Sequence, residues 1–203
     1  MSQIALPLAP VHGGDPPSIV IGSGNRAVAE ALQAPENWPF HSAVLMGPPR
    51  SGKSLLAKWF VNAGLGGAID GADAEDETTL FHRWNRAQED GTPLLLVVDG
   101  EQWDIMLPDL QTRIRASLQL EIGPPDDVMA ADLILSHAAQ RGLALGEGAP
   151  AYLVPRMERS HAAIERVVAE IDRLSLERKV PATLSVWRDA LEAVQGPEQG
   201  RLL

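Results

Sequence analysis

The stretch Ser42-Ala-Val-Leu-Met-Gly-Pro-Pro-Arg-Ser-Gly-Lys-Ser-Leu-Leu-Ala57 decides the fold of this chain. Gly47 to Ser54 match the pattern G-x-x-x-x-G-K-[ST], which forms a phosphate-binding loop when a strand precedes it and a helix follows it. Both flanks fit, because Ala43 to Met46 is an apolar run and the apolar residues after Ser54 recur at helical spacing. The alternative is an incidental glycine-rich turn, but the full match favours a phosphate-binding loop.

Each residue type in this loop has a chemical reason to be there. Glycines let backbone N–H groups close around phosphate oxygens, and the positive end of the following helix dipole faces the same charge. Lys53 is expected to reach the β- and γ-phosphates of a nucleotide, and the Ser54 hydroxyl to ligate Mg²⁺. We therefore predict that ADP or ATP binds with Mg²⁺ at a loop made of Gly47, Pro48, Pro49, Arg50, Ser51, Gly52, Lys53 and Ser54.

Composition and charge limit the other classes of function. The 203 residues are 45% apolar, and 17 Lys and Arg against 27 Asp and Glu give a formal net charge of −10. This charge argues against direct sequence-specific DNA binding, because affinity for phosphate backbones depends on clustered Lys and Arg. The chain has no cysteine, which excludes disulfides and thiolate metal sites. It shows no signal-like or membrane-spanning apolar segment, so we expect a cytoplasmic protein.

The pattern along the chain predicts three regions. Residues 1–17 are rich in proline and glycine and predict an extended tail, residues 18–123 predict an α/β base, and residues 124–203 predict a helical lid. The expected strands of the base are Ala43 to Met46, Ala68 to Asp70, Leu94 to Val98 and Leu118 to Ile122.

The tail contains an apolar hexapeptide, Gln3-Ile4-Ala5-Leu6-Pro7-Leu8. It is either a strand that docks on its own domain or a peptide ligand for the groove of a partner, and composition alone does not decide between them.

Several motifs, taken in order, resemble a known family. They are the phosphate-binding loop, Phe81-His82-Arg83-Trp84-Asn85, Val98-Asp99 and Leu107-Pro108-Asp109-Leu110-Gln111-Thr112-Arg113, followed by the helical region. Together they resemble the AAA+ module of the DnaA replication initiators, and they are more similar still to the DnaA-related Hda regulators. The resemblance spans nearly the whole chain, and the hexapeptide is similar to the sliding-clamp-binding peptide of Hda-like proteins.

The resemblance implies a reduced AAA+ base with a parallel sheet and a C-terminal helical lid. It implies that Asp99 is the sensor-1 position of the nucleotide site, that Arg113 is the arginine finger, and that Gln3, Ile4, Leu6, Pro7 and Leu8 bind the clamp. It names the initiator DnaA and the DNA polymerase sliding clamp as partners. The tail's affinity for the clamp is expected to rise through avidity when the chain forms a homodimer or when the clamp offers several sites.

Three departures from the family pattern weaken the chain's own active site. The Walker B counterpart is Ala68-Ile69-Asp70, with Asp70 as the expected Mg²⁺ ligand and Gly71 where the family often has a second acidic residue. Too few residues separate Gly64 from Asp70 for the usual edge strand and its helix. Ala162 replaces the sensor-2 arginine, for which Arg159 is the remaining candidate.

The resemblance thus implies a nucleotide-bound, clamp-tethered regulator that stimulates ATP hydrolysis by DnaA, and the departures predict that it is itself a weak or inactive ATPase. The alternative is a free-standing P-loop ATPase or small-molecule kinase, which needs a catalytic base and an acceptor site. The alternatives to these functional roles are that Asp70 is merely a solvated carboxylate and that Arg113 merely forms a surface ion pair. We expect Arg113 to act in trans on the nucleotide of the partner.

Overall fold

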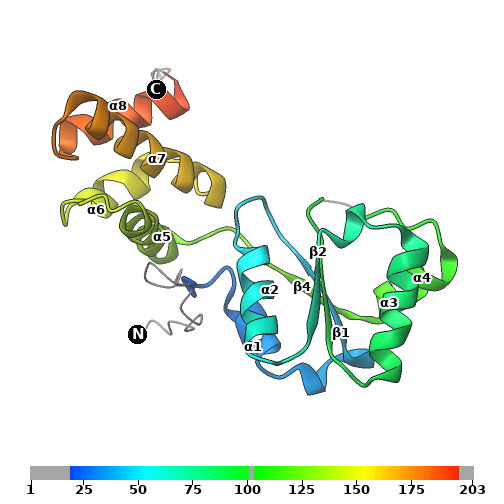
Figure 1. The fold of residues 1–203 in the computed structure, drawn as a ribbon. Coiled ribbons are helices and arrows are strands. Elements are labelled where there is room, and N and C mark those ends of the chain that lie inside the picture. Colours follow the sequence, from blue (N-terminus) through cyan, green and yellow to red (C-terminus); the bar gives the residue numbers. More distant parts are fainter. Residues whose placement is uncertain (1–18, 101–102, 197–203) are drawn as a thin grey trace, which may run out of the picture. The chain divides into compact units, whose positions relative to one another are not determined.

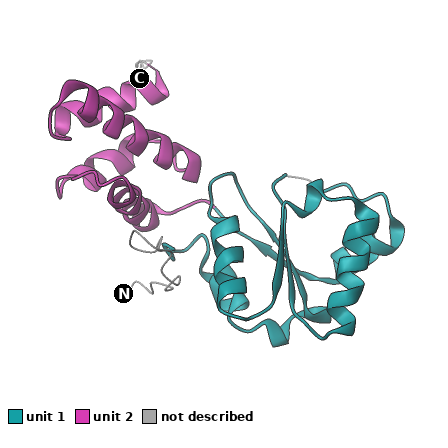
Figure 2. Cartoon of the chain, in the orientation of Figure 1, with its two compact units in different colours: residues 1–123 teal, residues 124–203 magenta. Residues whose placement is uncertain are grey.

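The computed structural model of the chain describes residues 19–100 and 103–196 (Figure 1). These residues form two compact units, of which the first ends at Gly123 and the second begins at Pro124 (Figure 2). The first unit is an α/β base and the second consists of helices. The predicted tail, residues 1–17, and its hexapeptide Gln3 to Leu8 lie outside the described residues.

The base contains a four-stranded parallel sheet in the order β2-β3-β1-β4. In the registers, Val44 lies opposite Leu96, and Leu45 lies opposite Leu120. The prediction of four strands is confirmed, although each strand is displaced by one residue at one end. Their bounds are Ser42–Met46 for β1, Gly67–Asp70 for β2, Leu94–Val97 for β3 and Leu118–Glu121 for β4.

Helices cover both faces of this sheet. Helices α1 (Arg26–Leu32) and α2 (Lys53–Asn62) lie on one face, and α3 (Glu77–Glu89) and α4 (Pro108–Ala116) lie on the other (Figure 1). Alternate side chains of β1 belong to two different apolar clusters. Leu45 packs in the cluster with α1 and α2, whereas its neighbour Val44 packs in the cluster with α3 and α4. Short 3₁₀ turns complete the base at Pro35–Asn37, Pro39–His41 and Ala72–Ala74.

The turn between α2 and β2 is too short to hold the additional edge strand and helix of the family pattern. Helix α2 ends at Asn62, Gly64 has a φ of 70°, and β2 begins at Gly67. A Cβ atom on Gly66 would lie 2.3 Å from the carbonyl oxygen of Pro93 and 2.8 Å from the ring of Phe60. Only glycine therefore permits this short return, and it leaves β2 as an edge strand of the described sheet.

The second unit is a helical lid with its own core. Side chains cap two of its helices: Asp126 accepts the N–H of Met129 at 2.8 Å, and Ser160 accepts that of Ala163 at 3.2 Å. From Ala149 to Arg156 the chain forms an α-helix followed by a 3₁₀ turn, since Pro155 has no N–H to continue an α-helix. The elements are α5 (Asp127–Gln140), α6 (Ala149–Leu153), a 3₁₀ turn (Val154–Arg156), α7 (His161–Arg178) and α8 (Leu184–Gln195).

The apolar faces of the helices in this second unit form its core. Ile134 of α5, Leu153 of α6, Ile164 and Val168 of α7 and Ala190 of α8 are all fully buried in one cluster. No helix in the described ranges has the length and apolar character that a transmembrane span requires.

Candidate functional site

The phosphate-binding loop connects the end of β1 to the start of α2. Gly47, the first loop residue, has a φ of 155°, and a Cβ on it would lie 2.9 Å from the Cβ of Ile122. Any larger residue would therefore push the loop away from β4. Gly52 precedes the first helical residue, Lys53, so the N-terminus of the ten-residue helix α2 opens onto the loop.

Lys53 and Ser54 lie at the centre of this site. The Lys53 ammonium donates to the carbonyl oxygens of Gly47 at 2.8 Å and Pro48 at 3.2 Å, and its side chain is only 6% exposed. The Ser54 hydroxyl donates to Oδ1 of Asp70, at the end of β2, at 3.1 Å. The structure therefore brings Ser54 and Asp70 together, as an Mg²⁺ site formed by the two residues requires.

Asp99 follows β3 and completes the group. Its Oδ1 lies 4.0 Å from the Lys53 ammonium, and its side chain is 71% exposed. Lys53, Ser54, Asp70 and Asp99 thus converge at the carboxyl ends of β1, β2 and β3, which is where ligands bind in parallel sheets.

The remaining loop residues fit a phosphate group. Pro49 and Arg50 are exposed, and Ser51 is buried. The Ser51 hydroxyl oxygen has no hydrogen-bond partner among the described residues, although it is shielded from solvent. Because burying a polar atom without a partner is costly, this hydroxyl fits a loop that closes around ligand oxygens.

The acidic segment after β2 has a structural role that the sequence did not reveal. Asp73 accepts the backbone N–H groups of Asp99 at 3.0 Å and Gly100 at 2.8 Å. Partial burial opposes ionisation of Asp73, but these two N–H groups and the charge of Lys53 hold the pKa of its carboxyl below the usual value. Asp73 therefore fixes the turn that carries Asp99.

Glu77, at the start of α3, plays the same role further along. Its two carboxylate oxygens accept the N–H groups of Met106 at 2.8 Å and Leu107 at 2.6 Å. Asp73 and Glu77 thus bind the backbone at both ends of the connection between β3 and α4. Sequence reasoning assigned no role to Asp73 or Glu77, and the only signal was the density of carboxylates between Asp70 and Glu77.

The predicted arginine finger, Arg113, is half-buried against α3. Its guanidinium carbon lies 4.5 Å from the ring centroid of Phe81 and 4.6 Å from that of Trp84, and its Nη1 donates to Oδ1 of Asn85. The alternative interpretation, in which Arg113 forms a surface ion pair, is wrong, since no carboxylate of the described residues contacts its guanidinium.

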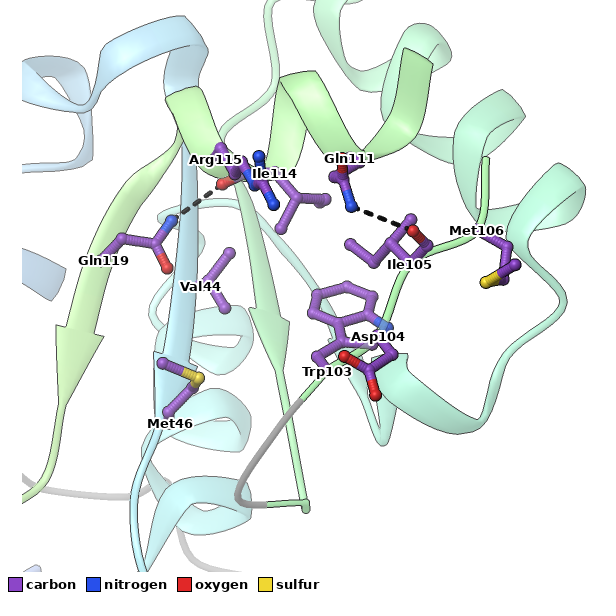
Figure 3. Close-up of a pocket in the computed structure, with 10 residues that line it drawn as sticks. All are labelled: Val44, Met46, Trp103, Asp104, Ile105, Met106, Gln111, Ile114, Arg115 and Gln119. Atoms are coloured by element: carbon purple, nitrogen blue, oxygen red, sulfur yellow. Dashed lines mark hydrogen bonds between the residues drawn. The ribbon is translucent and has the colours of Figure 1, made fainter. Parts of the chain in front are cut away.

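Arg115, two residues further along α4, has different surroundings. Its side chain is exposed, and it makes no hydrogen bond or ion pair with the side chains or backbone of the described residues. It lies at a hollow of about 860 Å³ beside β1 and β4 (Figure 3). The hollow is lined by Val44, Met46, Trp103, Asp104, Ile105, Met106, Gln111, Ile114, Arg115 and Gln119.

In the lid, Arg159 is engaged by another residue. Its Nη2 lies 3.0 Å from Oδ1 of Asp127, and both side chains are largely exposed. Ala162, where the family pattern has the sensor-2 arginine, is partly buried on α7. No three His, Asp or Glu side chains in the described ranges gather as a metal-binding cluster.

The comparisons with known proteins show the fold. No protein-family model matches the chain. Domain III of the replication initiation protein DnaA from Thermotoga maritima is similar with a TM-score of 0.73 and 14% identity, over 88% of this chain and 95% of that one.

Two further structures are similar over less of their length. DnaA from Aquifex aeolicus bound to AMPPCP has a TM-score of 0.60 and 18% identity, over 79% of this chain and 66% of that one. The Holliday junction branch migration motor RuvB from Thermotoga maritima has a TM-score of 0.62 and 17% identity, over 88% and 73%. The chain therefore shares the fold of DnaA domain III and RuvB, as the sequence predicted, with a four-stranded parallel sheet in its base and a helical C-terminal part.

Proposed function

We propose that this chain is an Hda-like regulator of DNA replication initiation. In this proposal it binds ADP or ATP, attaches to the sliding clamp through its N-terminal tail, and stimulates ATP hydrolysis by the initiator DnaA. The observation that carries the nucleotide part is the group formed by Lys53, Ser54 and Asp70 at the phosphate-binding loop. That a DnaA of similar fold is bound to AMPPCP supports the same part.

The residues at the loop define how a nucleotide is held. Lys53 donates to carbonyl oxygens of its own loop, and phosphate oxygens are stronger acceptors for the same ammonium. The loop N–H groups and the Ser51 hydroxyl supply further donors, and Ser54 and Asp70 hold Mg²⁺. Bound Mg²⁺ neutralises phosphate charge.

The chain's own site lacks groups that efficient hydrolysis needs. Gly71, after Asp70, has no carboxylate to orient an attacking water. Arg159 pairs with Asp127, and Ala162 provides no cation for a γ-phosphate. Without such groups, the charge that develops in the transition state is poorly stabilised, and slow intrinsic hydrolysis follows.

The stimulating group is Arg113, which acts in trans on ATP held by DnaA. An arginine supplied from outside the nucleotide's own pocket accelerates an otherwise slow site by about 10³- to 10⁵-fold. The surroundings of Arg113 support this role. Phe81 and Asn85 of the base contact its guanidinium, and no carboxylate of the described residues neutralises it.

The experiment measures hydrolysis of DnaA-bound ATP with clamp and DNA present, with and without this protein, and separately the ATPase activity of the protein alone. We expect strong stimulation and an intrinsic turnover well below about 1 per second. Intrinsic turnover at or above that rate without stimulation would instead favour the free-standing ATPase or kinase.

The tail peptide is the proposed contact with the clamp. Gln3 serves as its polar anchor and Leu6 and Leu8 as its apolar anchors. Because an isolated peptide loses conformational freedom on binding, its affinity is expected to be weak, roughly micromolar. Deletion of the first eight residues is expected to abolish clamp binding in a pull-down while leaving ADP affinity unchanged. Undiminished clamp binding after the deletion would reject this contact.

A further inference from the structure

We propose that Phe81, Trp84 and Asn85 of α3 are positioning residues for Arg113, and we call these three residues the arginine cradle. The inference rests on the proposed function, in which Arg113 acts on the nucleotide of a partner. The three residues occupy positions i, i+3 and i+4 of one helix, so they share one face. They come from the Phe81-His82-Arg83-Trp84-Asn85 motif, which the nucleotide site does not use.

The cradle holds the guanidinium in a particular way. The rings of Phe81 and Trp84 lie 4.5 Å and 4.6 Å from its central carbon, which places the cation near two π faces. Asn85 accepts from Nη1 and thereby fixes rotation about the side chain. The three contacts restrict the faces of the group and only one of its five N–H donors.

This leaves most of the hydrogen-bonding edge of Arg113 unused. Within the described residues the only hydrogen bond of its guanidinium is the one to Asn85, and the guanidinium makes no ion pair. A carboxylate partner would instead occupy two N–H donors of the guanidinium at once, and it would neutralise the positive charge that attracts a phosphate. Aromatic faces and one amide therefore orient the arginine without neutralising it.

Orientation before binding has a direct effect on rate. A free arginine side chain must lose much of its rotational freedom when it meets a phosphate, whereas a cradled one has lost part of it already. Arg115 lies on the same helix without such contacts, so the exposed arginine is the less organised of the two. Removing the cradle should lower the maximal stimulated rate more than it weakens the complex.

The test uses matched substitutions at Phe81, which is half-buried. F81L keeps an apolar side chain but removes the π face, whereas F81Y keeps the ring and its hydroxyl can reach solvent. N85A removes the amide acceptor. For each full-length variant, hydrolysis of DnaA-bound ATP is measured with clamp and DNA as a function of the concentration of the variant, next to ADP affinity and Tm.

We expect F81L and N85A each to lower the maximal rate about tenfold, with little change in the half-saturating concentration, while F81Y stays within about twofold of wild type. ADP affinity should be unchanged in all three variants. Wild-type maximal rates in F81L and N85A, when R113A has lost stimulation, would overturn the cradle and leave the proposed function standing. If R113A stimulates like wild type, the proposed finger itself is wrong. Should F81L fail to fold, as Tm and ADP binding would reveal, N85A alone decides between these outcomes.

Discussion

Lys53 and Arg113 are two cations of the same base unit, and the structure holds them in different ways. Lys53 is almost fully buried and donates to the carbonyl oxygens of the loop to which it belongs. Arg113 is half-buried between two aromatic rings and an amide of a neighbouring helix. The oxygens around Lys53 can be exchanged for phosphate oxygens at the same place, whereas the contacts of Arg113 leave its N–H edge available. This difference fits our proposal, in which Lys53 binds the chain's own nucleotide and Arg113 acts on a partner's.

The largest expected effect is on stimulated hydrolysis and comes from removing Arg113. Arg113→Ala should lower stimulated hydrolysis of DnaA-bound ATP by about 10³-fold or more, because the developing phosphate charge loses its guanidinium. Arg113→Lys should recover little, since an ammonium lacks the planar fork of donors. Arg115→Ala is the matched control and should retain stimulation; loss in Arg115→Ala alone would transfer the role to Arg115.

The next largest effect is on nucleotide affinity and comes from removing Lys53. Lys53→Ala should weaken ADP and ATP binding by about 100-fold, because a charge-assisted hydrogen bond to phosphate contributes about 1.5 to 3 kcal/mol and the ammonium makes more than one. Calorimetry measures the affinities. Lys58→Ala, an exposed lysine on the same helix, should bind as wild type does. Equal affinities for wild type and Lys53→Ala would reject the nucleotide site.

The nucleotide half of the comparison could be predicted from the sequence because its information is local. Gly47, Gly52, Lys53 and Ser54 belong to one stretch, and the strand before it and the helix after it follow from apolar periodicity. The sheet followed from three apolar stretches and one alternating stretch, Leu118 to Ile122, and the absence of a further edge strand followed from the short path between Gly64 and Asp70.

The contacts of Arg113, and those of Asp73 and Glu77, could not be predicted from the sequence, because they join residues far apart in it. Arg113 and Asn85 are 28 positions apart, Asp73 and Asp99 are 26 apart, and Glu77 and Leu107 are 30 apart. A carboxylate that accepts backbone N–H groups and one that is solvated look the same in a sequence. Only the packing of α3 and α4 on the sheet distinguishes them.

A smaller effect, on binding of ATP with Mg²⁺, tests the role of Asp70 in the nucleotide site. Asp70→Asn should weaken binding of Mg²⁺–ATP about tenfold, since an amide oxygen carries no net charge toward the cation. The same variant measured in EDTA is its own control, and there the loss should disappear. A loss that persists without Mg²⁺ would mean that Asp70 acts on the loop through Ser54 rather than on the metal.

The smallest effect concerns Asp73, which links the site to the turn that carries Asp99. Its folded-state pKa lies below the unfolded value, so its contribution to stability is present above about pH 4 and is lost as the pH falls through the lowered pKa. Asp73→Asn should lower Tm by about 2 °C at neutral pH, with the difference from wild type shrinking toward about pH 3. Asp90→Asn, at an exposed ion pair with Arg86, is the matched control. A Tm difference that stays constant from pH 7 to pH 3 would contradict this role of the Asp73 carboxylate.

The measurement that tests the central claim most directly asks which protein's ATP is hydrolysed. DnaA is loaded with ATP labelled on the γ-phosphate, this protein with unlabelled nucleotide, and release of labelled phosphate is followed in a single turnover with clamp and DNA; the labels are then exchanged. The account predicts rapid release when DnaA carries the label and slow release when this protein carries it. Rapid release from label on this protein, in the presence or absence of DnaA, would contradict the account.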